Sequence, residues 1–183
     1  MYRKITERRD IVRNSKKIIF SLLGLLLFAT VLPSSIKAYT HNGSKISNPN
    51  NAYYWIHGEF SKYGLKGEVL RGITAWNPSS KIQFTKESSL PGGANVKIEY
   101  VDRYNGDTYG IFRGSGNVTL FKKWRVELDS ARRKETAVHE VGHALGLGHT
   151  QKSNDSISVM RQYEFNYKDY PQSDDWAGIN ARY

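Results

Sequence analysis

Residues 139–149 decide the fold, and they read His-Glu-Val-Gly-His-Ala-Leu-Gly-Leu-Gly-His. Helical residues four positions apart differ by about 40° around the axis, so His139 and His143 project from one face, one turn apart. Two imidazoles in that arrangement can bind one metal ion, with Glu140 beside them. The opposite face is apolar and can pack against a core through Val138, Val141 and Leu145.

A third ligand follows the helix. Gly146 can turn the chain out of the helix through a left-handed conformation, because glycine has no Cβ, and His149 then returns to the same ion. Three neutral imidazoles leave the fourth position of a tetrahedral zinc open for water, as in catalytic zinc sites. Glu140 is then placed to take the proton of that water as it attacks a carbonyl. The pattern predicts hydrolysis of peptide bonds.

The composition limits the class of protein. A chain of 183 residues is long enough for one domain with a hydrophobic core. Hydrophobic residues make up 39% and charged residues 24%, which is typical of globular rather than disordered proteins. The chain has no cysteine, which excludes thiol nucleophiles, disulfide scaffolds, iron–sulfur clusters and cysteine-bound zinc.

The first 38 residues differ in charge from the rest. They hold eight Lys or Arg and two Asp or Glu, so most of the net charge of +10 lies here and does not indicate a nucleic-acid partner. An uncharged run of 15 residues, 18–32, follows the basic start, and Ala38 ends the segment. This pattern predicts a signal peptide over residues 1–38 that is cleaved after Ala38. The alternative is a retained anchor, but a membrane span usually needs about 20 apolar residues.

The remainder predicts a single α+β domain. Residues 39–51 are polar and predict an extended N-terminal arm, which leaves residues 52–183 as the catalytic domain. Strands are expected at 52–56, 82–85, 96–101 and 117–121, with a long loop at 102–116. Helices are expected at 65–76, from Asp129 or Ser130 to about Leu147, and from near Ser173.

The chain resembles a known family through several segments. Residues 139–149 match the metzincin pattern H-E-x-x-H-x-x-G-x-x-H, and Ser158-Val-Met160 resembles the Met-turn of that clan. Residues 75–77 (Ala-Trp-Asn) with 82–84 (Ile-Gln-Phe), and the C-terminal stretch 173–183, are similar to the matrixin branch. The resemblance, to matrixin-like metzincin zinc metalloproteases of the bacterial secreted type, covers most of residues 52–183.

This resemblance implies a zincin-like single domain. It consists of a twisted mixed β-sheet, a long active-site helix that carries the zinc ligands His139, His143 and His149, and a C-terminal helix. Met160 would form a hydrophobic base under the zinc. Astacins and serralysins place a tyrosine ligand two residues after this methionine, where this chain has Gln162. Tyr163 is therefore interpreted as a wall of the specificity pocket.

Other expectations about metals follow from what the chain lacks. Matrixins usually hold a second, structural zinc, but only His41 and His57 remain outside the motif, and both are interpreted as ordinary surface or turn residues. A cysteine switch of latency is impossible without cysteine. Asp102 and Asp107 offer hard oxygen ligands for Ca²⁺, although their spacing fits no standard calcium loop.

The hypothesis from sequence is a secreted zinc endopeptidase that cleaves extracellular proteins, with Glu140 as the catalytic residue. We expect a monomer, a polypeptide substrate paired with an edge strand near residues 117–120, and no nucleic-acid or membrane partner after cleavage. The sequence leaves open whether an inhibitor protein takes the place of a prodomain. The alternative is an exported, non-catalytic, zinc-stabilised protein that binds a polypeptide or a cell-wall polymer. Binding alone does not need Glu140, so this residue discriminates the two.

Overall fold

The computed structural model describes residues 39–183. The predicted signal peptide, residues 1–38, lies outside the described residues. Within the described part, no helix has the length and apolar character that a membrane crossing requires.

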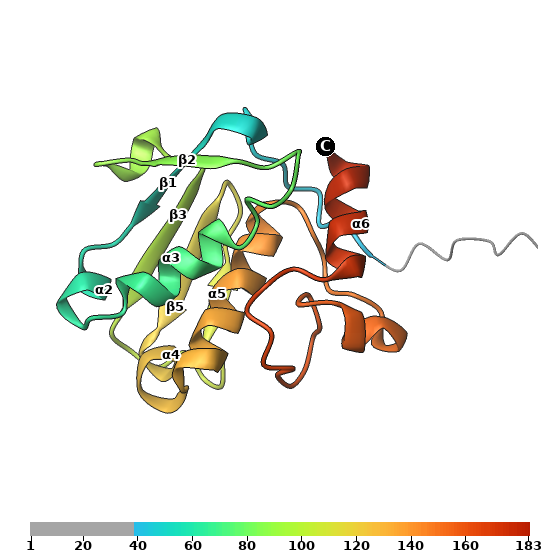
Figure 1. The fold of residues 1–183 in the computed structure, drawn as a ribbon. Coiled ribbons are helices and arrows are strands. Elements are labelled where there is room, and N and C mark those ends of the chain that lie inside the picture. The colour runs from blue at the N-terminus through green and yellow to red at the C-terminus, as the bar shows by residue number, and fades with distance from the viewer. Residues whose placement is uncertain (1–38) are drawn as a thin grey trace, which may run out of the picture. The chain divides into compact units, whose positions relative to one another are not determined.

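One five-stranded sheet organises the domain, in the order β2-β1-β3-β5-β4 (Figure 1). The strands β2, β1, β3 and β5 run parallel to one another, and β4 is antiparallel to β5. The bounds are β1 Ala52–Ile56, β2 Phe84–Glu87, β3 Val96–Val101, β4 Gly110–Phe112 and β5 Asn117–Phe121. The mixed sheet with interleaved helices confirms the predicted α+β, zincin-like fold.

The edge of the sheet differs from the prediction. Residues 117–120, expected at the edge, belong to β5, which lies between β3 and β4. The edge strand is β4, inside the segment 102–116 that was expected to be a loop. A strand of three residues is too short to show an alternating pattern, and its neighbours are glycine, aspartate and asparagine, which favour loops.

The helices are α2 Glu59–Lys62, α3 Lys66–Thr74, α4 Lys122–Glu127, α5 Ser130–Ala144 and α6 Ser173–Arg182. Short 3-10 helices occupy Pro49–Asn51, Pro91–Gly93 and Lys152–Ile157. Sequence reasoning missed α2 and α4, which have four and six residues and no room for a helical period. The strand expected at 82–85 begins two residues later, because the Asn77 side chain holds Phe84 through both its backbone N–H and its carbonyl.

Helix α5 begins where the sequence predicts. Asp129 is its N-cap, and the side-chain oxygen accepts a hydrogen bond from the Arg132 N–H at 2.9 Å, which satisfies one of the free donors of the first turn. The helix ends at Ala144, three residues before the predicted end near Leu147. The residues that follow form the turn to His149.

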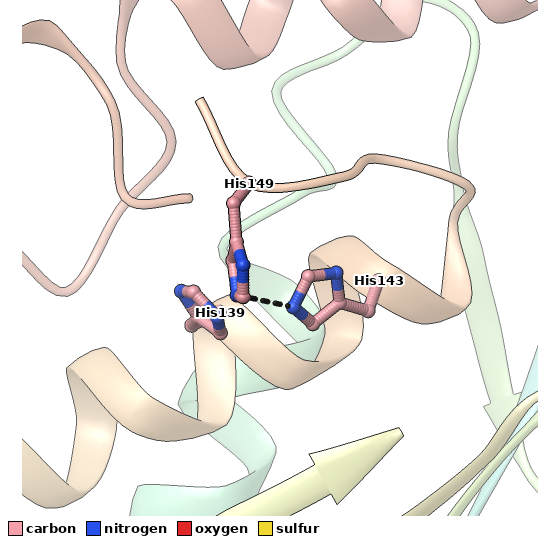
Figure 2. Close-up of side chains that lie close together, drawn as sticks. All are labelled: His139, His143 and His149. Carbon is pink, nitrogen blue, oxygen red and sulfur yellow. Dashed lines mark hydrogen bonds between the residues drawn. The ribbon is translucent and has the colours of Figure 1, made fainter. Parts of the chain in front are cut away.

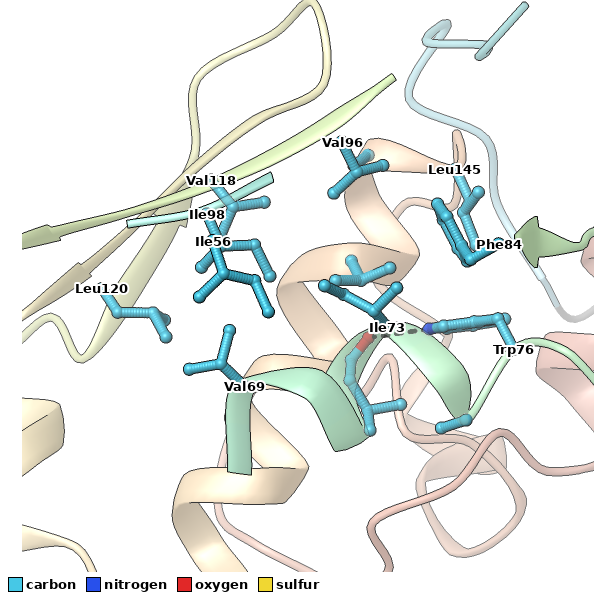
Figure 3. Packing of buried hydrophobic residues seen from close by; sticks show 14 of the residues in the cluster. Ile56, Val69, Ile73, Trp76, Phe84, Val96, Ile98, Val118, Leu120 and Leu145 are labelled. Atoms are coloured by element: carbon cyan, nitrogen blue, oxygen red, sulfur yellow. Dashed lines mark hydrogen bonds between the residues drawn. The ribbon is translucent and has the colours of Figure 1, made fainter. Parts of the chain in front are cut away.

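The core lies between the sheet and the helices α3 and α5 (Figure 3). Val69 and Ile73 of α3, with Val138 and Val141 of α5, are buried against the strands. Each such side chain contributes about 1.5–3 kcal/mol through removal of apolar surface from water. The indole N–H of Trp76 donates to the Val138 carbonyl at 3.3 Å. The apolar face predicted for residues 138–145 therefore packs α5 against the core. His139 and His143 lie on the opposite face of the helix.

Candidate metal centre

Three histidines converge at the end of α5 (Figure 2). His139 and His143 stand one turn apart on the helix, and His149 comes back over them from the turn that follows. One ring nitrogen from each residue lies within 4.8 Å of the others, and Nε2 of His143 is 3.2 Å from Nε2 of His149. Among the described residues, this is the only group of three side chains of metal-ligand type.

Backbone carbonyls fix the orientation of two of these imidazole rings. Nδ1 of His139 lies 2.8 Å from the Val159 carbonyl, and Nδ1 of His143 lies 2.8 Å from the Leu147 carbonyl. A carbonyl only accepts, so each Nδ1 carries the proton and each Nε2 keeps its lone pair. Metal-bound histidines are held in this way in other proteins.

The donor set fits a zinc ion. Two nitrogens that each lie about 2.0–2.1 Å from a tetrahedral zinc are roughly 3.3 Å apart, close to the separation of the two Nε2 atoms above. Burial lowers the pKa of His139 to about 3 and that of His143 to about 4, with a smaller contribution from neighbouring histidines. Both rings are therefore neutral at pH 7, which is the form that binds a metal.

Glu140 faces the cleft between the histidines and β4. This residue is 7% exposed, and its Oε2 atom has no hydrogen-bond partner among residues 39–183. Burial raises the pKa of Glu140 to about 8, partly offset by a backbone hydrogen bond from Phe112. A cation held by the histidines would lower this pKa again, because it favours the carboxylate. Such a group exchanges protons near neutral pH, as a general base requires.

Two hollows flank this carboxylate. A smaller one of about 260 Å³ lies over the three histidines and is bounded by β4. A larger cavity of about 520 Å³ adjoins His139 and Glu140 and extends along the segment that follows the Met-turn. Tyr163 lines this cavity with its side chain 72% exposed, next to Gln162, so the structure places Tyr163 beside the cleft. Its role in specificity stays a prediction.

Met160 lies beneath the helix that carries the histidines. It is buried, and its sulfur packs against Gly142 of α5 and near the Trp76 ring. Two hydrogen bonds fix the backbone of Met160. Its carbonyl accepts from the Thr150 N–H at 2.8 Å, and the Met160 N–H donates to Ser158 Oγ at 2.9 Å. This packing matches the supporting position that the resemblance implies.

Two buried carboxylates near the site were missed by sequence reasoning. Asp175 of α6 accepts hydrogen bonds from the Ser158 hydroxyl at 2.5 Å and the Val159 N–H at 2.8 Å, so it fixes the Met-turn. Glu135 of α5 accepts from the N–H groups of Asn166 and Tyr167 at 2.9 and 2.7 Å, and so fixes the loop around the larger cavity. Burial raises the pKa of both groups, and these hydrogen bonds oppose the rise.

Those acids gave no distinctive local signal. In the sequence, Asp175 looks like an ordinary acid in the first turn of a helix. Glu135 looks like one of several charged residues of a helix. Glu135 does lie four residues before His139, and therefore on the same face of α5. That spacing was the one available sign that it would face the cleft.

The residues considered for calcium do not come together with further acids. Asp102 accepts from the Tyr100 hydroxyl at 2.8 Å and from Arg125 at 3.1 Å, and Asp107 pairs with Lys123 at 2.7 Å. Each carboxylate is thus already engaged by a cationic side chain, which gives no support to the calcium hypothesis.

The two remaining histidines lie apart from the triad. The His41 ring is exposed, with Nε2 3.0 Å from the Gly178 carbonyl, and His57 stacks beside Trp55. Neither residue belongs to a group of three potential metal ligands in residues 39–183. Nothing in their surroundings supports a second zinc.

Comparison with known proteins agrees with the geometry. Residues 121–183 match a family model described as matrixin. The chain is 27% identical over 131 residues to human matrix metalloproteinase-20, and 29% identical over 136 residues to macrophage metalloelastase from Oryctolagus cuniculus, each alignment covering 63% of this chain. It is also 27% identical over 103 residues, 52% of the chain, to the zinc metalloproteinase nas-36 of Brugia malayi.

The aligned regions are a limited part of those relatives. They span 27%, 28% and 16% of the respective lengths. The family match includes α5, the His149 turn, Met160 and α6, which are the elements that build the site. By its sequence and its fold, this chain is similar to the matrixin-like metzincins.

Proposed function

We propose that this protein is a zinc-dependent endopeptidase that hydrolyses peptide bonds of extracellular proteins. The observation that carries the proposal is the Oε2 atom of Glu140, which has no hydrogen-bond partner among residues 39–183 and is buried beside three imidazoles whose ring nitrogens converge. His139, His143 and His149 would hold the zinc. A zinc ion supplies Lewis acidity, which makes a water molecule acidic near neutral pH and polarises a carbonyl oxygen.

Glu140 is the residue of this chain that would transfer the proton. Its carboxylate takes the proton from the attacking water at Oε2, and the resulting carboxylic acid then gives that proton to the leaving amine. Both steps require that Glu140 gain and lose the same proton; burial raises its pKa and a bound zinc would lower it. Burial also keeps bulk water from competing for the carboxylate.

Strand β4 is suited to hold an extended substrate. In the part of the chain that the structure describes, its outer edge has no strand partner, and it borders the hollow over the histidines. A peptide that adds to this edge gains main-chain hydrogen bonds and lies across Glu140. A side chain of the substrate would then enter the larger cavity, with Tyr163 at its wall.

The cellular setting is proposed from the leader. A signal peptide over residues 1–38 would direct the chain to secretion, and the mature protein would act as a monomer outside the cell. The chain has no cysteine with which to block the zinc, so an inhibitor protein is proposed as the control of activity.

The test combines chelation with one isosteric substitution. The purified protein is expected to digest casein or gelatin, and to stop when a zinc chelator removes the metal. Glu140→Gln is expected to keep zinc but to lower proteolysis by about a hundredfold or more, because the amide cannot accept the proton. Equal activity of the two proteins, with one zinc bound in each, would refute the mechanism. A zinc-loaded parent without peptidase activity would favour the non-catalytic binding protein.

A further inference from the structure

The turn that carries His149 is paired with a segment from the other end of the described chain. We define the N-terminal strap as residues 40–44. It runs antiparallel to residues 146–148: the Asn42 N–H donates to the Gly146 carbonyl at 3.0 Å, and the Gly148 N–H donates to the Thr40 carbonyl at 2.9 Å. The turn between α5 and the third histidine is therefore held by backbone contacts that lie about a hundred residues away in sequence.

The Asn42 side chain reaches further into this turn. Its Nδ2 donates to the His143 carbonyl at 2.8 Å and to the Leu147 carbonyl at 3.0 Å. The Leu147 carbonyl is also the partner of Nδ1 of His143, at 2.8 Å. One amide group thus fixes both the main chain of His143 and the oxygen that orients the ring of His143.

The remaining contacts keep the strap in place. Thr40 Oγ1 donates to the His149 carbonyl at 2.6 Å, and Asn42 Oδ1 accepts from the Ser44 N–H at 2.9 Å. The Arg182 guanidinium of α6 donates to the carbonyls of Gly43 and Ser44 at 2.7 and 2.6 Å. The Asn42 amide is therefore held by the Ser44 N–H of its own strap, and Arg182 of α6 holds the strap itself.

We propose that Asn42 is a positioning residue of the metal centre, which acts through the Leu147 carbonyl on His143. Leu147 lies past the end of α5, so its carbonyl has no partner in the helix, and the hydrogen bonds that the structure shows for it come from Asn42 Nδ2 and His143 Nδ1. Partners behind a metal-bound histidine typically change metal affinity by about 10–100-fold when they are lost. This inference rests on the proposed zinc site, but it does not require peptidase activity.

The experiment compares two substitutions of Asn42 with one of its neighbour, all in the full chain. Asn42→Asp has nearly the same shape and keeps the Oδ1 acceptor, but it lacks the Nδ2 donors. Asn42→Ala removes the side chain without adding a charge. His41→Ala is the matched control, because the His41 ring lies on the same strap and contacts the Gly178 carbonyl of α6 instead of the metal turn.

Three quantities are measured without any substrate: zinc affinity by competition with a chelator, the visible spectrum of the cobalt-loaded protein, and thermal melting of the metal-free protein. Both Asn42 variants are expected to lower zinc affinity about tenfold or more and to alter the cobalt spectrum. His41→Ala is expected to stay within about twofold of the parent in affinity. The metal-free variants should melt close to the parent.

Two results would overturn the proposal. Zinc affinity of the Asn42 variants within about twofold of the parent would show that the amide does not act on the ligands. An equal loss of affinity in His41→Ala would show that the strap supports the fold in general. A parent protein that binds zinc but cleaves no protein would refute the proposed function. The zinc affinities of the variants could still be compared, because their measurement needs no peptidase activity.

Discussion

The position of His149, the third proposed metal ligand, depends on a single glycine. Gly146 has φ of +101°, and a Cβ at this position would run into the Ser44 carbonyl oxygen of the strap. Both the left-handed backbone and the close approach require glycine. His139 and His143 need no such turn, because they lie on a regular helix.

We therefore expect different results from two substitutions at this turn. His149→Ala should weaken zinc binding and leave the fold largely intact, since the apolar face of α5 is untouched. Gly146→Val should damage both, because valine is strained at positive φ and displaces the strap. Metal content and thermal melting, with and without added zinc, check the pair. A Gly146→Val protein that binds zinc and melts like the parent would contradict the role of this turn.

Gly142 allows the methionine to lie under the active-site helix. A Cβ there would meet the Met160 sulfur at an impossible distance and the Trp76 ring at 2.9 Å. The Met-turn can therefore approach α5 only where the helix has no side chain.

Gly142→Ala is expected to lower the free energy of unfolding by about 1–3 kcal/mol, as overpacking of a core does. The control is Gly67→Ala in α3, where nothing lies within 4 Å of the new Cβ. Alanine should be tolerated there or stabilise the helix by up to about 1 kcal/mol. Denaturant unfolding of both variants provides the comparison, and similar stability of the two would show that the Met-turn moves aside freely.

At the level of elements, α6 supports the site from a distance. Asp175 is 1% exposed and holds the Met-turn to the first turn of α6, where it also accepts from the Gln172 N–H at 2.7 Å. The Met-turn also contains the Val159 carbonyl, which orients the His139 ring. One buried carboxylate thus connects the C-terminal helix to His139, a proposed metal ligand.

Asp175→Ala should lower the free energy of unfolding by at least about 2 kcal/mol, because it leaves several buried donors without a partner. Asp169→Ala is the control: its half-exposed pair with Arg71, at 3.3 Å, is worth about 1 kcal/mol or less. Chemical denaturation measures both. Equal losses would mean that the Met-turn is held mainly by its apolar contacts.

At the scale of the molecule, residues 1–38 differ in charge from the residues that follow. The positive charge is concentrated in residues 1–38, whereas the domain that follows carries only a small excess. The strap begins directly after the proposed cleavage site, so removal of the leader at Ala38 keeps Thr40 and Asn42 on the mature chain.

The secreted protein is accordingly expected to begin at Tyr39 or within a few residues of it. N-terminal sequencing of protein from the culture medium checks this. Recovery of chains that begin at Met1, solely in membrane fractions, would favour a retained anchor.

Long periodic segments could be predicted well, and short ones could not. The spacing of apolar residues and the Asp129 cap predicted the start of α5, and the fold class followed from the interleaved elements. β4, α2 and α4 are too short for their periodicity to rise above chance. The missed strand β4 led to the wrong edge of the sheet for substrate pairing.

The sequence by itself determined the three histidines, their neighbour Glu140 and the need for glycine at position 146, because those depend on helical geometry over eleven residues. Only the tertiary structure decided which distant groups hold them in place. These groups are Asn42 of the strap, Glu135 and Asp175. Each of them bonds to residues that are distant from it in the sequence. Their hydrogen bonds form only after the core has packed, so no local pattern records them.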